Sequence, residues 1–266
     1  MKKLFILYAI IGVLLFGGCS KKDDNNDNDN NTTPSQYFPV LIEDFSHTDC
    51  GPCANVDNAV NTVLEYYASQ DASPIFMEFH PKPTGFGDDP FNLANPELHD
   101  GRMNWYYDYY GLDNVPQLFV DATVLSATDR NDVDRIQQIV EDAKNSPKPA
   151  TISGSASIDG DSIRLQVTIT ADSSITADVF CYLVRETITF TTAPGSNGLE
   201  EFHMIPAAQF EWENPTPTAS FTELDINSSV DIPDEISGGT TDGYSAIVVV
   251  QDNERNILGV ARFDIE

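Results

Sequence analysis

The sequence predicts an α/β domain over residues 37–146, followed by an all-β sandwich domain over residues 150–266. Two observations support this division. In the first part, apolar runs that suit buried strands alternate with stretches whose apolar residues recur at helical spacing. After a stiff Pro-Lys-Pro linker at 147–149, apolar and polar residues alternate strictly, as in residues 163–170, and this alternation indicates half-buried strands.

Three strands are predicted in the first domain. They lie at residues 40–45, 75–79 and 117–120, and a turn near Asp121 follows the last of them. Short, mainly apolar runs of this kind are typical of strands that are buried in a sheet. Residues 80–94 are rich in Pro, Gly and Asp, so we expect a long loop there.

Three helices are predicted between and after these strands. The first runs from near Pro52 to about Ala68, with apolar residues on one stripe. The second is capped by Asn95 and ends at Gly111, because these residue types favour the two ends of a helix. The third helix is capped near Asn131.

The second domain is predicted to contain about seven short strands with turn residues between them. They lie at residues 151–158, 163–170, 176–190, 202–210, 220–226, 244–250 and 257–265. This pattern is typical of an immunoglobulin-like β-sandwich. No arrangement of residues typical of catalysis occurs in this half, so we expect a role in scaffolding or adhesion.

The first 36 residues are predicted to direct and anchor the chain. Residues 1–18 form a lipoprotein signal peptide, because a basic start precedes an apolar run that is too short to span a bilayer. Cys19 resembles the lipidated cysteine of bacterial lipoproteins and would attach the chain to the membrane. Residues 19–36 are an acidic tether, expected to be disordered because they lack large apolar residues. Acidic residues close behind Cys19 resemble a surface-export signal, which favours the outer membrane and the cell surface, with its periplasmic face as the alternative.

The charge of the chain restricts its partners. With 14 Lys and Arg against 42 Asp and Glu, the formal net charge is −28, which argues against binding nucleic acid. We expect no cofactor. The His and acidic residues of 80–100 lack the regular spacing of a metal-binding loop, so no metal site is predicted there.

Cys50-Gly51-Pro52-Cys53 follows the first predicted strand directly. A cysteine at a helix N-terminus is stabilised as a thiolate, and a second one about a turn later is close enough to form a disulfide. The pair predicts thiol–disulfide exchange with protein thiols or disulfides, or with a redox partner protein. Such pairs also bind zinc, so a zinc or copper site is an alternative, although few further ligands lie nearby. Cys181 lies in a strand-like run and is interpreted as a small buried hydrophobe.

Val115 and Pro116 lie in a second motif, where a helix-ending Tyr-Gly is followed by Val-Pro and an apolar strand. Together with the cysteine pair, this segment resembles the thioredoxin superfamily. The resemblance implies that Pro116 follows a cis peptide bond and faces the disulfide, and that both residues hold the substrate backbone. It also implies that Asp44, six residues before Cys50, is a buried carboxylate that moves protons to and from Cys53. The alternative is an Asp at a strand end that points to water.

Two residues next to the cysteines depart from the thioredoxin pattern, and a third could offset their effect. Asp49 stands where thioredoxin has Trp, and Ala54 stands where it has Lys. A nearby carboxylate and a missing cation both raise the pKa expected for Cys50. A protonated His47 would compensate, but we interpret His47 as an exposed loop residue.

The chain from residue 37 onward also resembles the outer-membrane-protein-28-related lipoproteins of Gram-negative bacteria. The most specific matches are residues 41–46, which lead into the cysteines, and the segment that ends at Pro116. That family has no settled activity. The leading hypothesis is a membrane-tethered thiol–disulfide oxidoreductase in which Cys50 attacks and Cys53 resolves. The alternative is a non-catalytic surface binding or adhesion lipoprotein, in which the thioredoxin-like domain is a scaffold and the disulfide is structural.

Overall fold

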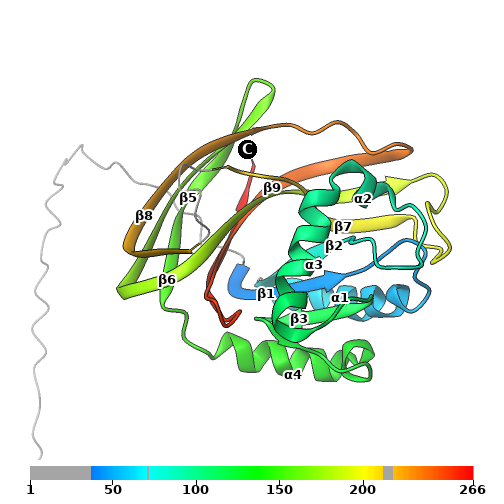
Figure 1. Cartoon of the computed structure of the whole chain (residues 1–266), viewed down its shortest axis with the longest axis horizontal. Helices are drawn as coiled ribbons and strands as arrows, with labels where there is room; N and C mark the ends of the chain where they lie inside the picture. Colours follow the sequence, from blue (N-terminus) through cyan, green and yellow to red (C-terminus); the bar gives the residue numbers. More distant parts are fainter. Residues whose placement is uncertain (1–36, 71, 212–217, 266) are drawn as a thin grey trace, which may run out of the picture. The chain divides into compact units, whose positions relative to one another are not determined.

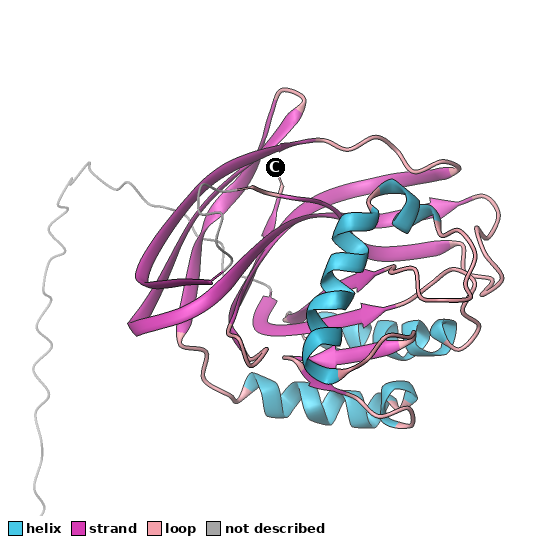
Figure 2. Ribbon diagram, in the orientation of Figure 1, coloured by secondary structure: helices cyan, strands magenta, loops and turns pink. Residues whose placement is uncertain are grey.

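The computed structural model describes residues 37–70, 72–211 and 218–265, which form a mixed α/β structure with a small sheet A and a large curled sheet B (Figures 1 and 2). By its internal contacts, Ser35–Glu266 is one compact unit. The predicted signal peptide, Cys19 and the tether lie outside the described residues. In the described ranges, no helix has the length and apolar character needed to cross a membrane.

Sheet A contains all three strands predicted for the first domain. It consists of β1 (Tyr37–Phe45), β2 (Ser73–Phe79), β3 (Gln117–Val120) and β4 (Thr123–Val124), in the order β2-β1-β3-β4. β1 is parallel to β2 and antiparallel to β3. This central position buries every residue of β1 from Val40 onward, which explains why the sequence there shows no alternation.

Helices cover both faces of sheet A. α1 (Cys53–Ala68) follows β1 and contacts α4 (Val133–Lys144) on one face, whereas α3 (Pro96–Tyr110) packs on the other (Figure 1). The predicted ends of α3 are confirmed. The Asn95 side chain caps its N-terminus, and Gly111 ends it in the left-handed conformation, with φ 69°.

Two local features of the first half differ from expectation. The expected loop at 80–94 contains a short helix, α2 (Pro90–Ala94), which begins after the capping residue Asp89. Five residues are too few for a periodic pattern to reveal a helix. The cap of α4 is Asp132 rather than Asn131, because Asn131 ends the preceding 3-10 turn, η1 (Asp129–Asn131).

Sheet B is a single curled sheet. It consists of β5 (Ala150–Asp159), β6 (Ser162–Phe190), β7 (Glu201–Gln209), β8 (Thr218–Asp231), β9 (Gly239–Gln251) and β10 (Ile257–Asp264). β5 and β8 pair with the first part of β6, and β7 and β9 pair with its last part (Figure 2). The strands expected at 163–170 and 176–190 are therefore one long strand. Because this strand runs through the whole of sheet B, the described strands β5 to β10 form one hydrogen-bonded sheet, and the two-sheet sandwich is not confirmed.

The two sheets share a hydrophobic core. Residues 177–184 of β6 and 245–251 of β9 are largely buried on both faces, so that Val249 packs with the core of sheet A while its neighbour Val248 packs inside the curl of sheet B. Cys181 also lies inside the curl and is fully buried, as predicted, and burial raises its pKa to about 12. The division into two domains near 147–149 stays a prediction.

Candidate functional site

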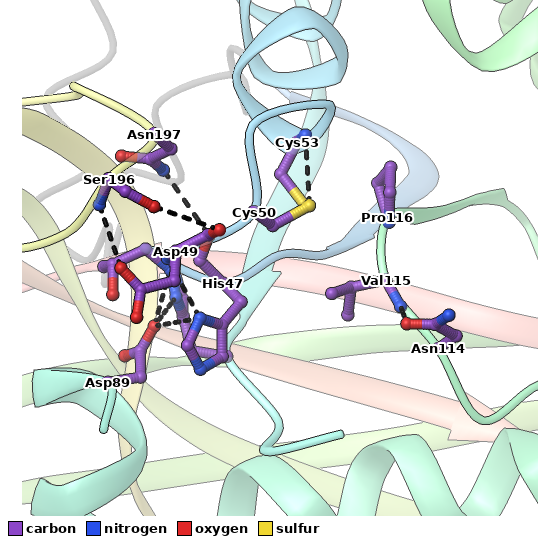
Figure 3. The surroundings of a disulfide bond; sticks show 12 residues. His47, Asp49, Cys50, Cys53, Asp89, Asn114, Val115, Pro116, Ser196 and Asn197 are labelled. Atoms are coloured by element: carbon purple, nitrogen blue, oxygen red, sulfur yellow. Dashed lines mark hydrogen bonds and ion pairs between the residues drawn. A yellow bond between two sulfur atoms is a disulfide. The ribbon is translucent and has the colours of Figure 1, made fainter. Parts of the chain in front are cut away.

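Cys50 and Cys53 form a disulfide where β1 leads into α1 (Figure 3). The Cys53 backbone N–H, at the helix N-terminus, donates to the Cys50 carbonyl oxygen at 3.1 Å and to Cys50 Sγ at 3.2 Å. Both cysteines are buried, and Cys50, at 3% exposed against 0% for Cys53, is the slightly less buried of the two.

The Val115–Pro116 peptide bond is cis, as expected. Pro116 faces the disulfide in Figure 3, and Val115 belongs to the same hydrophobic cluster as both cysteines. The Pro116 carbonyl accepts a hydrogen bond from the Arg130 guanidinium group, which joins the proline segment to η1. The two sequence motifs therefore meet at one place in the fold.

Asp44 is fully buried on β1, so the alternative in which it points to water is wrong. Neither of its carboxylate oxygens has a hydrogen-bond partner among the residues that the structure describes. Burial raises the pKa of Asp44 well above its ordinary value, and the negative charges of Glu78 and Asp57 raise it further, against smaller opposing effects of His80 and Arg130. Both effects favour the protonated form of the Asp44 carboxyl group.

Two further carboxyl groups beside Asp44 were missed in the sequence. Glu78 pairs with Asp44 across the parallel strands, so both side chains lie on the face that α1 covers. Asp57 lies one turn after Cys53 on the buried stripe of α1. Burial and the Glu78 charge raise the pKa of Asp57 to about 7. Two features of the sequence could have revealed these groups. Asp57 lies four residues after Cys53, and Glu78 is an acid within an otherwise apolar strand.

A buried ion-pair network extends from Glu78. His80 Nε2 lies 3.0 Å from Glu78 Oε1, and His80 Nδ1 lies 2.9 Å from Asp89 Oδ2. Burial alone lowers the pKa of His80, but the two carboxylates outweigh it and raise the pKa to about 10. Asp89 also accepts the Thr48 backbone N–H at 2.8 Å, so the network braces the segment before Cys50. Among the residues that the structure describes, no group of three or more His, Cys, Asp or Glu side chains is arranged to hold a metal ion.

The interpretation of His47 as an exposed residue is wrong. Its side chain is fully buried, and its ring packs against Phe86 with centroids 4.8 Å apart. Its Nδ1 atom accepts the backbone N–H of Asp49 at 3.0 Å. Burial lowers the pKa of His47, so it is neutral at pH 7 and supplies no positive charge to Cys50.

A loop of sheet B holds the segment that precedes Cys50. The Asp49 carboxylate accepts the Ser196 N–H at 2.9 Å, and the Thr48 carbonyl accepts the Asn197 N–H at 2.8 Å (Figure 3). Gly195 permits this approach, since a Cβ atom there would lie 2.3 Å from the Thr48 carbonyl oxygen. The β6–β7 loop is therefore part of the site, although no sequence pattern connected it to the cysteines.

Comparisons with known proteins bear on the fold. No protein-family model matches the chain, and no curated protein matches its sequence. The solved structure of HBP35 of Porphyromonas gingivalis superposes with a TM-score of 0.66 at 12% identity, over 86% of this chain and 75% of that one. A structural-genomics protein from Agrobacterium tumefaciens gives a TM-score of 0.50 at 16% identity, over 84% of this chain and 93% of that one. These similarities show a shared fold alone and are compatible with a thioredoxin-like fold.

Proposed function

We propose that this chain is an extracytoplasmic thiol–disulfide oxidoreductase that uses the Cys50–Cys53 couple. The observation that carries the proposal is one arrangement: a disulfide at a helix N-terminus, facing Pro116, with the buried Asp44 on the strand that leads into it. A structural disulfide needs no buried carboxyl group without a hydrogen-bond partner, and such a group is costly to keep. A redox couple uses one to move protons.

The first half of the proposed cycle reduces the protein. A donor thiolate attacks Cys50 Sγ, the Cys50–Cys53 bond breaks, and the Cys53 sulfur leaves with its electron pair. Asp44 supplies the proton that Cys53 takes up. A second donor thiolate then attacks the donor sulfur of the mixed disulfide and Cys50 leaves as a thiolate, so that two electrons have passed to the protein while the donor thiols have released their protons to water.

The second half reduces the substrate. The Cys50 thiolate attacks a substrate disulfide, and one substrate sulfur leaves as a thiolate that takes a proton from water. Cys53 then gives its proton to Asp44 and attacks Cys50 Sγ, which reforms the disulfide and releases the second substrate thiol. Val115 and Pro116 hold the substrate backbone next to Cys50 in both halves.

The test is insulin reduction by the protein from Tyr37 onward, with a dithiol donor. We expect turnover by the wild type and none by Cys50→Ser, because the attacking sulfur is absent. Cys53→Ser is the matched variant and should trap a mixed disulfide with insulin. Equal activity in the wild type and Cys50→Ser rules out this mechanism.

The second candidate is a non-catalytic surface binding or adhesion lipoprotein with a structural disulfide. The near-complete burial of both cysteines favours it, because a buried disulfide is shielded from attack. A redox titration separates the two functions. A potential below about −300 mV indicates a structural disulfide, whereas a higher potential indicates a working couple.

The location and family are part of the proposal. A lipid on Cys19 would tether the chain to the outer membrane, with the site on the cell surface or, alternatively, facing the periplasm. Metabolic labelling with palmitate should mark the wild type and not Cys19→Ser, and protease treatment of intact cells distinguishes the two faces. The lipoprotein signal, the tether, the thioredoxin-like half and an immunoglobulin-like β half together support placement among the outer-membrane-protein-28-related lipoproteins.

A further inference from the structure

Residues 114–116, here called the proline segment, lie opposite the disulfide and lead into β3 (Figure 3). In the described ranges, side chains make two hydrogen bonds to the backbone of this segment. The Asn114 Oδ1 atom accepts the Val115 N–H at 2.9 Å. The Arg130 guanidinium group donates to the Pro116 carbonyl. The first bond is internal to the segment, so Arg130 is the described side chain that ties this backbone to another element.

Arg130 connects the proline segment with the helix that carries Cys53. It belongs to η1, which contacts both α1 and α4. Because α1 begins at Cys53, η1 packs against the helix that holds one of the two sulfur atoms. The hydrogen bond from Arg130 therefore helps to set how the proline segment lies relative to the disulfide.

The half-buried guanidinium group of Arg130 lacks a compensating carboxylate. Arg102, Lys148 and Arg262 each form an ion pair at a buried or half-buried position, whereas no carboxylate among the described residues pairs with Arg130. Its Nε atom is buried and has no hydrogen-bond partner in the same ranges. Burial lowers the pKa of Arg130, and the charge of Asp44 opposes this effect. A cation in this position is costly to keep, so a role in stability alone does not account for it.

The segment that Arg130 holds is the one proposed to bind the substrate backbone. A binding edge that is ordered before the substrate arrives gives more affinity, because ordering it on binding costs free energy. A hydrogen bond from a charged donor is stronger than one between neutral groups, so the Arg130 contact suits this task. A small disulfide without a peptide backbone does not use such an edge.

We propose that Arg130 is a positioning residue that fixes the proline segment for the binding of polypeptide disulfides. The inference rests on the proposed function and names its substrate class as polypeptides rather than small-molecule disulfides. The guanidinium group takes no part in the exchange of electrons. It holds the Pro116 carbonyl, so that Val115 and Pro116 present a preorganised edge beside Cys50.

The test measures turnover of two substrates with a dithiol donor: insulin, and hydroxyethyl disulfide, which contains no peptide backbone. In Arg130→Gln the KM for insulin should rise about 10-fold, as the loss of one hydrogen bond from a charged donor predicts, while kcat stays within about twofold. The reason is that a contact which holds the substrate equally in the ground state and the transition state affects KM alone. The rate constant for hydroxyethyl disulfide is the internal reference and should change by less than about twofold.

Two further variants keep the test decisive. Arg135→Gln makes the same change at an exposed position of α4, where the guanidinium group donates to the Gln138 side chain, and should behave as the wild type. Arg130→Lys keeps the charge and one donor but not the planar fork of a guanidinium group, so the KM for insulin should rise about threefold. This variant decides the matter if Arg130→Gln does not fold.

The outcomes distinguish this inference from the proposed function. A KM for insulin that equals the wild-type value in the Arg130 variants overturns the inference and leaves the oxidoreductase intact. Equal losses of rate with both substrates, together with a higher Cys50 pKa measured by alkylation, also overturn it, because the guanidinium group then acts on the sulfur. A wild type that turns over neither substrate overturns the proposed function and the inference with it.

Discussion

Glu43 and Asp44 are neighbours on β1, and both are buried, but their surroundings are opposite. Successive side chains of a strand point to opposite faces of the sheet. Glu43 therefore faces α3 and Asp44 faces α1. One strand thus carries two buried carboxyl groups into two different environments.

The Glu43 carboxylate is fully compensated. Arg102 donates to it from Nε at 2.7 Å and from Nη2 at 3.1 Å, and the Tyr106 hydroxyl donates to it as well. The Gln251 side-chain amide donates to the Tyr106 hydroxyl oxygen at 3.2 Å. Burial lowers the pKa of Arg102, but the charge and hydrogen bonds of Glu43 together with two neighbouring tyrosines outweigh burial and raise it, so the guanidinium group stays charged. The network joins β1, α3 and β9, and we interpret it as structural.

Among the described residues Asp44 has no such partner, and the negative charges of Glu78 and Asp57 outweigh the positive charges of His80 and Arg130 around it. Burial and this excess of negative charge both favour the protonated form of the acid. The comparison shows how a single strand separates two tasks. The paired carboxylate stabilises the contact with sheet B, and the unpaired one remains able to exchange a proton beside the disulfide.

The largest effect is expected when the structural pair is broken. Arg102→Met leaves Glu43 buried without a counter-charge, which should lower the free energy of unfolding by about 3–5 kcal/mol. Urea unfolding of the oxidised protein measures this loss. The double variant Glu43→Met/Arg102→Met should recover most of it, because no buried charge remains. Equal stability of the wild type and Arg102→Met would falsify the structural interpretation of Glu43.

The second prediction concerns the other carboxyl group. Asp44→Asn removes the acid but no hydrogen bond or ion pair, so we expect unchanged or higher stability. The rate of disulfide reduction should fall by about 100-fold, the lower end of what general acid–base catalysis contributes. Single-turnover reduction and urea unfolding on the same sample test both parts. A loss of stability with an unchanged rate contradicts the assignment.

A third effect is expected in the pH dependence of stability. Burial and the Glu78 charge raise the pKa of Asp57 in the folded protein to about 7 from its ordinary value of 3.8, so between these values the folded protein binds more protons than the unfolded chain. Stability from this group is therefore full below about pH 4 and is lost as pH rises towards 7. Between pH 5 and 6 the loss should approach 1.4 kcal/mol, the value for one fully titrating group. If the urea midpoint declines equally with rising pH in the wild type and in Asp57→Asn, the raised pKa of Asp57 is not the cause of the decline.

The parts of the site that could be predicted depend on short stretches of sequence. The cysteine pair, the start of α1 and the Val-Pro segment each lie within one local pattern, and the structure brings them together. Asp44 was found through its fixed spacing from Cys50. These features are local because a strand, a helix cap and a turn each depend on a few neighbouring residues.

The parts that were missed depend on contacts between distant segments. Glu78 lies beside Asp44 only because of the register in which β1 and β2 pair, and the sequence of neither strand alone determines that register. The burial of His47 results from packing against Phe86. The length of β6 also escaped prediction, because the polar residues at 172–174 read as a turn although the strand continues through them.

The smallest effect is expected at Asp49, where sheet B reaches the site. We expect Asp49→Ala to remove the acceptor of the Ser196 N–H and to lower the free energy of unfolding by about 1 kcal/mol, the usual net value of one hydrogen bond. The rate of disulfide reduction should stay within about twofold, because the Asp49 backbone carbonyl still accepts the Ser196 hydroxyl at 3.2 Å. Ser196→Ala, which keeps the backbone N–H, is the matched control for that second contact. If Asp49→Ala instead lowers the Cys50 pKa, measured by its alkylation rate against pH, the carboxylate tunes the sulfur as well as holding the β6–β7 loop.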